Sequence, residues 1–448
     1  MIHEERIRAL NDVGILDGDY VLYWMQSSVR AEFNHALEYA VGYANRLGRP
    51  LIAFFGLTDA YPEANMRHYN FLIEGLRDVR SSLEDRGIEL MVRLASPESG
   101  VIDYGKRASL VIVDGGYTKI QKSWRRYAAG RLKCPLIQLE SDLIVPVETA
   151  SPKEEYSAAT FRPKIRRNLD RFMTPLGESE LAHPSLGMVV DSEDLRYIDR
   201  VLSRLDIDRE VGKVDSFRGG AVEAHRLLGD FIERKLGDYT ELRNDPTEDV
   251  QSGLSPYLHF GHISPLGIAL EIREADSHGS EAFLEELIVR RELSFNFVHY
   301  NYNYDSFECL PDWCKETLKK HAPDRREHLY SLRELEESET HDPYWNAAQS
   351  EMVKRGKMHR YMRMYWGKKI LEWGASPEEA FKTALYLNNK YELDGRDPNS
   401  YAGVAWCFGK HDRPWKERPI FGKVRYMNDR RLRRKFDADG YVRMVEGL

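Results

Sequence analysis

The chain has 448 residues, a formal net charge of −7 and a hydrophobic content of 42%. This length exceeds a single ordinary core and predicts two or more domains, and the acidic balance argues against a protein that is basic over its whole surface, although it allows a local basic face. The charged start, MIHEERIRALNDVG, and the lack of a membrane-length apolar run exclude a signal peptide and a spanning helix, so we expect a cytoplasmic protein without membrane contact.

Strand-like and helix-like patterns alternate over the first 140 residues. The first helix has Ser27 and Ser28 as N-cap candidates and ends at Gly48 and Pro50, and further helices are expected over 69–85 and from Ser96 onward. Continuous apolar runs between helices predict a parallel sheet covered on both faces. These strands are expected at 20–25, 51–56, 89–94, 110–116 and 135–140. Neither GxGxxG nor the P-loop motif is present, so this Rossmann-like assignment rests on alternation alone.

The pattern weakens between residues 141 and 217 and becomes almost entirely helical beyond it. The weak stretch contains five prolines and is expected to be a connector with some helix, lying over both domains: Pro146, Pro152, Pro163, Pro175 and Pro184. The predicted fold class is therefore α/β, with a Rossmann-like domain over 1–140, a connector over 141–217 and a large all-helical domain over 218–448.

Two segments have the composition of a ligand site, and the second, 387–406, has that of a pocket for a polar aromatic ligand. QSGLSPYLHFGHISP (251–265) places serines before prolines at two helix starts, where exposed amides and hydroxyls bind phosphate, although simple N-capping explains the same pattern. LNNKYELDGRDPNSYAGVAW (387–406) packs Asn and Asp residues between apolar Leu387 and Trp406, and a solvated loop with Asx-turns is the alternative. Tyr239 and Arg243 precede the first segment and are expected to wall the same site.

Two helical segments combine charge with aromatic residues. EELIVRRELSFNF (285–297) predicts an amphipathic helix with Glu and Arg pairs on a solvated face. In MHRYMRMYWGKKILEW (358–373), Trp366 and Trp373 are seven residues apart, on one face of the helix. A core stripe explains this spacing, and an electron-hopping chain with Trp345 as a third member is the alternative.

Two basic runs suggest one basic face on an otherwise acidic protein. Residues 352–371 contain seven Lys or Arg and no acid, and residues 423–436 contain seven against one acid. Such a face would follow a phosphate backbone. The four cysteines lack a metal-binding spacing and are expected to be free structural thiols, so no metal site is predicted.

Taken together and in this order, these segments closely resemble the photolyase and cryptochrome superfamily, and within it the class II cyclobutane pyrimidine dimer photolyases. The resemblance covers nearly the whole chain and is carried by SGLSPYLHFGHIS, EELIVRREL, HRYMRMYWGKKILEW, LNNKYELDGRDPNSYAGVAW and ERPIFGKVRYMN. Class I members usually carry Trp-x-Trp a few residues after the Asn pair. This chain has Lys390, Tyr391 and Glu392 there, which favours class II.

The resemblance implies a noncovalent, U-shaped FAD in the helical domain, active when reduced, and light-driven electron transfer to a pyrimidine dimer. The implied cofactor-binding residues are Tyr239, Ser252, Gly253, Leu254, Ser255, Arg363, Asn388, Asp394 and Asp397, with Asn388 at the flavin N5 edge. Trp366, Trp345 and Trp373 match the tryptophan chain for photoreduction. Glu286, Met364 and Trp406 are expected to line the lesion pocket, and Arg430, Arg431 and Arg433 to bind DNA phosphates.

The expected partner is damaged double-stranded DNA, bound by a monomer with the dimer flipped out of the duplex. One alternative is a cryptochrome-like blue-light sensor. Another is repair of pyrimidine (6-4) photoproducts, which usually needs histidines in the lesion pocket, with His359 and His411 as candidates. The sequence leaves open whether the N-terminal sheet holds a deazaflavin, a folate or no antenna chromophore.

Overall fold

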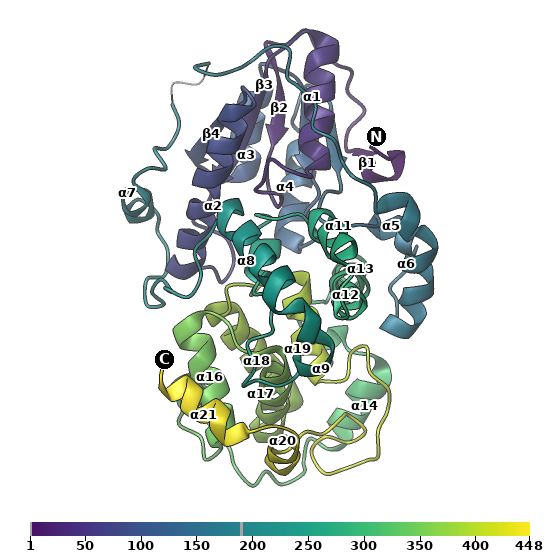
Figure 1. Ribbon diagram of the computed structural model, residues 1–448, viewed down its shortest axis with the longest axis vertical. Helices are drawn as coiled ribbons and strands as arrows, with labels where there is room; N and C mark the ends of the chain where they lie inside the picture. The colour runs from purple at the N-terminus through teal and green to yellow at the C-terminus, as the bar shows by residue number, and fades with distance from the viewer. Residues whose placement is uncertain (1, 189–190) are drawn as a thin grey trace.

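The computed structural model describes residues 2–188 and 191–448 of the chain, and its α/β part stands above a larger helical part (Figure 1). A six-stranded sheet forms the centre of the α/β part, in the order β1-β6-β5-β2-β3-β4. All neighbours are parallel except β1, which pairs antiparallel with β6. The strands are β1 (Ile7–Ala9), β2 (Tyr20–Trp24), β3 (Leu51–Leu57), β4 (Glu89–Leu94), β5 (Ala108–Asp114) and β6 (Leu136–Leu139).

Helices cover both faces of this sheet, as the continuous apolar strands predict. Helices α1 (His35–Leu47) and α2 (Met66–Asp85) pack on one face, and α3 (Pro97–Gly105) and α4 (Lys119–Ala129) pack on the other. Every residue of β2, β3 and β5 is buried, because a parallel sheet between two helical layers has no solvent face. The predicted fold class is thereby confirmed.

Two details of the α/β part differ from the expectation. Ser27 and Ser28 do not cap α1. Their backbone N–H groups donate to Asp114 at 3.1 and 2.6 Å, while Asn34 caps the helix by accepting from the Leu37 N–H at 3.1 Å. Strand β1 was not predicted at all, because three residues, of which two are exposed, carry no periodic signal.

The connector crosses the α/β part and covers an otherwise open edge of the sheet. It contains α5 (Val147–Ala150), α6 (Ala158–Phe172) and α7 (Ile198–Ser203), the last lying beside α2 in Figure 1. The Glu193 N–H donates to the Val92 carbonyl at 2.9 Å, and the Ser185 hydroxyl accepts from the Glu89 N–H at 2.8 Å. These bonds pair the outer backbone of β4, which prevents edge-to-edge association.

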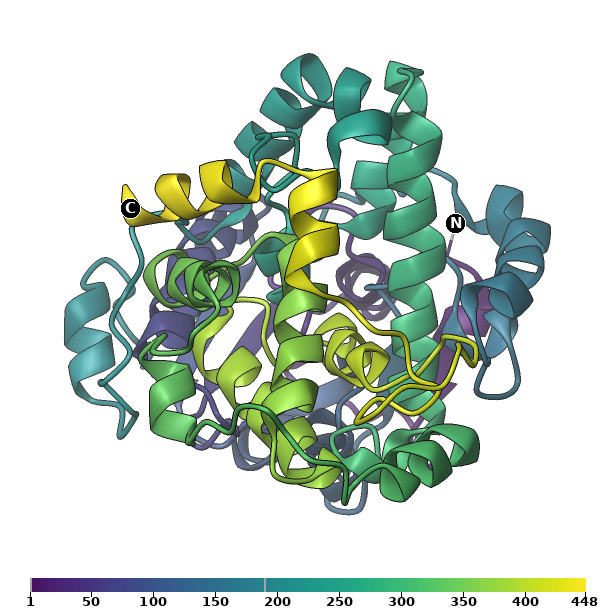
Figure 2. The same ribbon diagram turned by 90° about the horizontal axis from the view of Figure 1, so that it is seen from below.

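Short helices pack at steep angles in the rest of the chain, as Figure 2 shows from below. Helix α13 (Arg291–Tyr300) packs along α19 (Pro398–Cys407), and α17 (Arg360–Trp373) packs against both α16 (Pro343–Arg355) and α18 (Pro377–Tyr391). No helix in the two described ranges is both long and apolar enough to cross a membrane. The elements are α8 (Ala221–Arg234), α9 (Tyr239–Leu242), α10 (Ser255–His259), α11 (Pro265–Ala275), α12 (Ser280–Leu284), the π-helix η3 (Glu285–Arg290), α13 (Arg291–Tyr300), α14 (Asp312–Lys320), α15 (Leu332–Glu336), α16 (Pro343–Arg355), α17 (Arg360–Trp373), α18 (Pro377–Tyr391), α19 (Pro398–Cys407), α20 (Asp429–Lys435) and α21 (Ala438–Glu446), with 3-10 turns η1 (Glu4–Arg6), η2 (Leu236–Asp238) and η4 (Phe307–Cys309).

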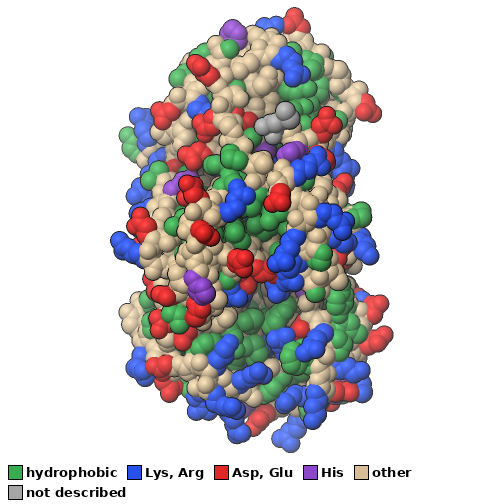
Figure 3. Space-filling model, turned by 45° about the vertical axis from the view of Figure 1, so that its right-hand side comes forward, with side chains coloured by type: hydrophobic (Ala, Val, Ile, Leu, Met, Phe, Trp, Pro, Cys, Tyr) green, Lys and Arg blue, Asp and Glu red, His purple; other side chains and the backbone are tan. Residues whose placement is uncertain are grey.

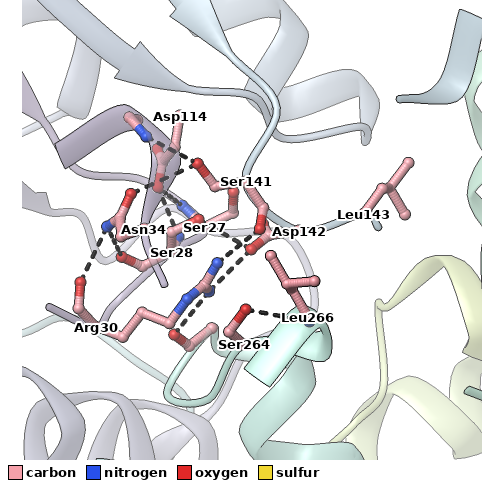
Figure 4. Close-up of polar contacts among 12 residues, drawn as sticks. Ser27, Ser28, Arg30, Asn34, Asp114, Ser141, Asp142, Leu143, Ser264 and Leu266 are labelled. Atoms are coloured by element: carbon pink, nitrogen blue, oxygen red, sulfur yellow. Dashed lines mark hydrogen bonds and ion pairs between the residues drawn. The ribbon is translucent and has the colours of Figure 1, made fainter. Parts of the chain in front are cut away.

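A buried polar cluster joins the α/β part to the helical part (Figure 4). Arg30 forms an ion pair with Asp142 at 3.0 Å and donates to the carbonyls of Ser141 and Gly261 at 2.7 and 3.1 Å. The guanidinium therefore links the loop after β2, the start of the connector and the turn before α11. Separating a buried guanidinium from the carbonyls that accept its hydrogen bonds is costly. This junction therefore fixes the relative position of the two parts.

A second junction places the start of α2 against the end of α18. The Arg67 guanidinium donates to the carbonyls of Tyr391 and Val353, both at 2.6 Å, and Asn65 Nδ2 donates to the Lys390 carbonyl at 2.7 Å. Asn389 Nδ2 in turn donates to Glu63 at 2.6 Å. The α/β part thus holds the polar segment 388–396 in place.

Candidate functional site

A cavity of about 280 Å³ opens in the helical part, where four segments meet. The loop before α10, the helix η3, the residues that enter α17 and the turn before α19 form its walls. Most of the predicted cofactor-binding residues lie in these walls, together with one predicted substrate residue: Ser252, Gly253, Leu254, Ser255, Arg363, Asp394, Asp397 and Glu286. Tyr239 and Asn388 are not wall residues, and neither are Met364, Trp406 or the three tryptophans of the predicted chain.

One end of the cavity is rich in phosphate-binding groups. Gly253 has φ of +70°, a conformation that other residues rarely adopt, and it turns the loop into the start of α10. Lys357 Nζ contacts the Ser255 hydroxyl and lies 3.3 Å from Asp394 Oδ2. An ammonium group beside hydroxyls and a helix start is the arrangement that binds a phosphate oxygen.

A buried cluster of charges lies beneath that end. Arg363 Nη2 is 3.2 Å from Asp394 Oδ1 and 2.9 Å from Glu392 Oε2. Burial raises the pKa of Glu392 to about 8 although Arg363 favours its ionised form, and the Asp394 carboxylate adds to the rise. Burial also acts to raise the pKa of Asp394, but Lys357 and Arg363 outweigh it and hold that pKa well below its ordinary value. The cluster therefore has one carboxylate, Asp394, between two cations, while burial favours the protonated form of Glu392.

Asn388 has a buried amide oxygen that no group in the described residues satisfies. Its Nδ2 donates to Asn389 Oδ1 at 3.1 Å and to the Ser400 hydroxyl at 2.8 Å, which fixes the orientation of the amide. Its Oδ1 is buried and has no hydrogen-bond partner among the described residues. A buried carbonyl oxygen without a donor is costly, so this geometry suits a ligand that brings an N–H or O–H group.

In η3, Glu286 lies in the cavity wall, whereas Arg290 is exposed to solvent. The segment was expected to form a regular amphipathic helix, but residues 285–290 form a π-helix. Glu286 pairs with Arg360 at 3.1 Å, and buried Arg291 donates to the Asp142 carbonyl at 2.8 Å. The extra residue in the π-turn rotates the helix face, which places Glu286 in the cavity wall.

Trp406 lies half-buried between two cations. The Lys368 ammonium is 4.9 Å from the centre of its ring, and the Arg425 guanidinium is 5.4 Å away. Asp412 holds Arg425 by two hydrogen bonds of 2.8 and 3.2 Å, and Arg425 also stacks on Trp415. The ring is thus fixed by neighbours that keep it from collapsing into the core.

The three tryptophans of the predicted chain are in contact. Trp345 and Trp366 have nearly parallel rings with centres 6.4 Å apart, and Trp345 and Trp373 have centres 5.6 Å apart. All three are buried, and the indole N–H of Trp366 donates to Gln349 at 2.9 Å. Core packing and electron hopping both remain compatible with these contacts.

Tyr239 is part of another aromatic cluster, where its ring lies 5.4 Å from that of Phe283, a cavity-wall residue.

Only one of the two basic runs is a solvent face. In the first run, Lys368 and Lys369 are buried and Lys357, Arg360 and Arg363 line the cavity, so the expectation of one joint basic face is wrong. In the second run, α20 exposes its basic side chains: Arg430, Arg431, Arg433, Arg434 and Lys435. Figure 3 shows Lys and Arg side chains around a hollow with a hydrophobic floor in the lower, helical part of the molecule.

A second cavity of about 100 Å³ lies at the carboxyl ends of β2 and β3. It was not predicted, although the carboxyl ends of parallel strands are where ligands bind in open α/β sheets. Its walls include Tyr61, Trp124 and His68 from the α/β part and His259 and Arg396 from the helical part.

Two residues of the first site, Lys357 and Glu392, were not predicted. The sequence analysis counted Lys357 in the first basic run and used Glu392 only to favour class II over class I.

Comparison with known proteins gives a consistent result. The DNA photolyase family model matches residues 21–182. The chain is 58% identical to the deoxyribodipyrimidine photo-lyase of Methanothermobacter thermautotrophicus, over 100% of this chain and 99% of that one. It is 41% identical to the deoxyribodipyrimidine photo-lyase of Oryza sativa subsp. japonica, over 99% of this chain and 90% of that one.

A solved structure shares the fold at low sequence identity. The archaeal photolyase from Sulfolobus tokodaii, described with two FAD molecules, superposes with a TM-score of 0.72 at 17% identity. The superposition covers 94% of this chain and 89% of that one. At this identity the likeness shows the arrangement of the α/β and helical parts.

Proposed function

The chain belongs to the deoxyribodipyrimidine photo-lyase family, and we propose that it repairs cyclobutane pyrimidine dimers in DNA by light-driven electron transfer. The observation that carries this proposal is the buried, unpartnered Oδ1 of Asn388, in a helical part whose cavity has a basic end suited to phosphate. A flavin dinucleotide supplies both complements: a ring with an N–H edge and a pyrophosphate. When bound, reduced FAD supplies on excitation the electron that splits the cyclobutane ring, and it takes that electron back.

We assign the cavity residues, together with Asn388 outside the cavity wall, to the two halves of the cofactor. Ser252, Gly253, Leu254 and Ser255 are placed at the pyrophosphate through hydroxyl and backbone groups, with Lys357 neutralising its charge. Arg363, Asn388, Asp394 and Asp397 are placed around the flavin. The Arg363 Nε, on a residue of the cavity wall, is also buried without a partner among the described residues, which supports a polar ligand in the cavity. Tyr239 supports this site through Phe283.

On the substrate side, we assign Glu286, Met364 and Trp406 to the pocket for the flipped dimer. The saturated pyrimidine rings present an apolar surface, which suits an aromatic wall held rigid by Lys368 and Arg425. The exposed arginines of α20 contact phosphates and supply affinity without lesion specificity. Flipping costs less at a dimer than at an intact base because the damaged pair stacks poorly.

We further assign the contacting Trp366, Trp345 and Trp373 to light-driven reduction of the oxidised cofactor, and the chain to class II. Residues 390–392, which replace the class I Trp-x-Trp, support the class assignment. We propose residues 1–140 as the antenna-type domain, 141–217 as the connector and 218–448 as the catalytic domain. The second cavity, walled by Trp124 and Tyr61, is our candidate site for an antenna chromophore.

The test uses an oligonucleotide with a single cyclobutane dimer. Protein with chemically reduced FAD is expected to restore the two pyrimidines under blue light and to leave the dimer intact in the dark. A light-independent reaction, or flavin photochemistry without any repair, would refute the assignment and favour a light sensor. The absorption spectrum before and after unfolding then shows whether a second chromophore is bound.

A further inference from the structure

Asn389 is fully buried, and both ends of its side-chain amide are hydrogen-bonded. Its Oδ1 accepts from the Arg396 backbone N–H at 3.0 Å, and its Nδ2 donates to Glu63 at 2.6 Å. A backbone N–H can only donate and a carboxylate can only accept, so these two partners determine which atom of the amide is the oxygen. The proposed function assigns Asn389 no role.

The orientation of the Asn389 amide determines that of Asn388. Asn388 Nδ2 donates to Asn389 Oδ1 at 3.1 Å and to the Ser400 hydroxyl at 2.8 Å. If the Asn388 amide were turned over, its oxygen would face the Asn389 oxygen, and two acceptors would meet without a proton between them. Asn388 therefore keeps its nitrogen on this side. Its buried Oδ1, which has no partner among the described residues, is the atom left to accept from a ligand.

Both partners of Asn389 have a backbone conformation that residues other than glycine rarely adopt. Glu63 has φ of +57° and Arg396 has φ of +65°, in the left-handed region. Glu63 belongs to the loop between β3 and α2, so this conformation directs a side chain of the α/β part at the helical part. Arg396 Nη1 also donates to the Asn389 carbonyl at 3.1 Å. Backbone strain of this kind persists where the surrounding structure fixes a functional geometry.

We propose that Asn389, held by Glu63, is a positioning residue that keeps the Asn388 Oδ1 facing the flavin as an acceptor. This inference rests on the proposed function, which places Asn388 beside the flavin. Reduced flavin carries a hydrogen on N5, whereas oxidised flavin presents a lone pair at the same atom. A fixed acceptor pairs with the first form and not with the second. Asn389 and Glu63 therefore bias the site toward reduced FAD, the form that the proposed repair requires.

Glu63 is needed because the Arg396 N–H holds only the oxygen end of the Asn389 amide. Without Glu63, Asn389 Nδ2 loses its acceptor, and a buried N–H without a partner is costly. Turning the Asn389 amide over then becomes easier, and a turned amide offers Asn388 a donor instead of an acceptor. The Glu63 side chain is exposed, so its replacement tests this link without opening the core.

The experiment is spectroelectrochemical titration of the FAD-loaded protein, which gives the midpoint potential of the bound flavin. A lower potential means a weaker preference for reduced over oxidised FAD. E63A is expected to weaken this preference roughly two- to tenfold, the factor that one hydrogen bond contributes. For a two-electron couple this lowers the potential by about 10–30 mV. N389L removes the Asn389 amide itself and is expected to lower the potential at least as much.

The sign of the shift separates orientation from simple charge. Loss of a negative charge near the flavin would by itself stabilise an electron-rich ring and raise the potential. E63Q loses the charge but keeps an acceptor for Asn389 Nδ2, so its potential should not fall. Asp59 provides the matched control, because it is an exposed acid of the same loop that accepts instead from the Asp206 N–H at 3.3 Å. D59A should not lower the potential.

A double variant tests whether the effect passes through Asn388. In an N388A background, E63A should cause no further fall, because the oxygen that Glu63 helps to orient is gone. An unchanged potential in E63A, an equal fall in D59A, or a fall that persists in the N388A background would overturn the proposal. Stability lost in N389L without a change in potential would make Asn389 a packing residue only. Failure of the wild type to bind FAD would overturn the flavin assignment itself together with this extension.

Discussion

Relative to the wild type, the E392Q variant should gain free energy of unfolding progressively as pH rises from 5 to 8.5. Glu392 is completely buried, and burial raises its pKa from the ordinary 4.5 to about 8. The folded protein therefore keeps a proton that the unfolded chain loses near its ordinary pKa, so the free energy of unfolding falls as pH rises between these two values. At about 1.4 kcal/mol per tenfold change in proton affinity, this loss reaches at most about 5 kcal/mol.

Gln cannot ionise, so E392Q avoids that loss. Its Oε1 keeps the acceptor that Glu392 offers the Met358 N–H at 3.2 Å, but its Nε2 takes the place of the Oε2 that accepts from Arg363 at 2.9 Å, so E392Q loses that contact at every pH. Because that loss does not depend on pH, the expected result is a free energy of unfolding that falls between pH 5 and 8.5 in the wild type by more than it does in E392Q.

The assay is urea unfolding followed by circular dichroism at a series of pH values, with FAD held at one saturating concentration because bound ligand adds to stability. The exposed Glu316 supplies the control, and E316Q, which retains Glu392, should follow the pH dependence of the wild type. If Glu392 were instead an ionised partner of Arg363 over this whole range, the wild type and E392Q would show the same dependence on pH. That result would refute the description of the charge cluster.

Four further substitutions test the site residues. W366F should block photoreduction of oxidised flavin yet spare repair by chemically reduced enzyme, and photoreduction at the wild-type rate would make the three tryptophans core packing only. N388A should retain FAD but lower the yield of stable reduced flavin under illumination, so an unchanged yield would count against its place at the flavin. W406A should weaken binding to DNA with a pyrimidine dimer about tenfold to a hundredfold, because it loses a stacking contact of roughly 1–3 kcal/mol. Its affinity for undamaged duplex should not change. A lowered melting temperature, or an undiminished preference for the lesion, would remove Trp406 from the site. Charge reversal at Arg431 should weaken binding to damaged and undamaged DNA equally, and it should reduce the slope of log binding constant against log salt concentration by about 0.9 per lost phosphate contact. A loss of affinity confined to lesion-containing DNA would instead place Arg431 in the lesion pocket. The same result is expected at Arg430 and Arg433.

Local sequence patterns determined most of the α/β part and several helix boundaries. Each buried strand of the parallel sheet is a continuous apolar run, and Gly48 ends α1 in the left-handed conformation with φ of +63°. Ser264 caps α11 as its position before a proline predicts. These features depend on residues a few positions apart, so they can be recognised without knowing the fold.

Only the tertiary structure decided which polar residues meet. Lys357, Arg363, Glu392 and Asp394 come from two segments that share no local pattern, and their assembly sets which carboxyl is charged. The sequence predicts a basic surface from the lysines of α17, yet Lys368 is buried and its ammonium lies against the Trp406 ring. Composition records that charges are present, whereas burial and pairing depend on contacts between residues far apart in the chain. Those long-range contacts set the free energy of each charge, and through it the chemistry of the site.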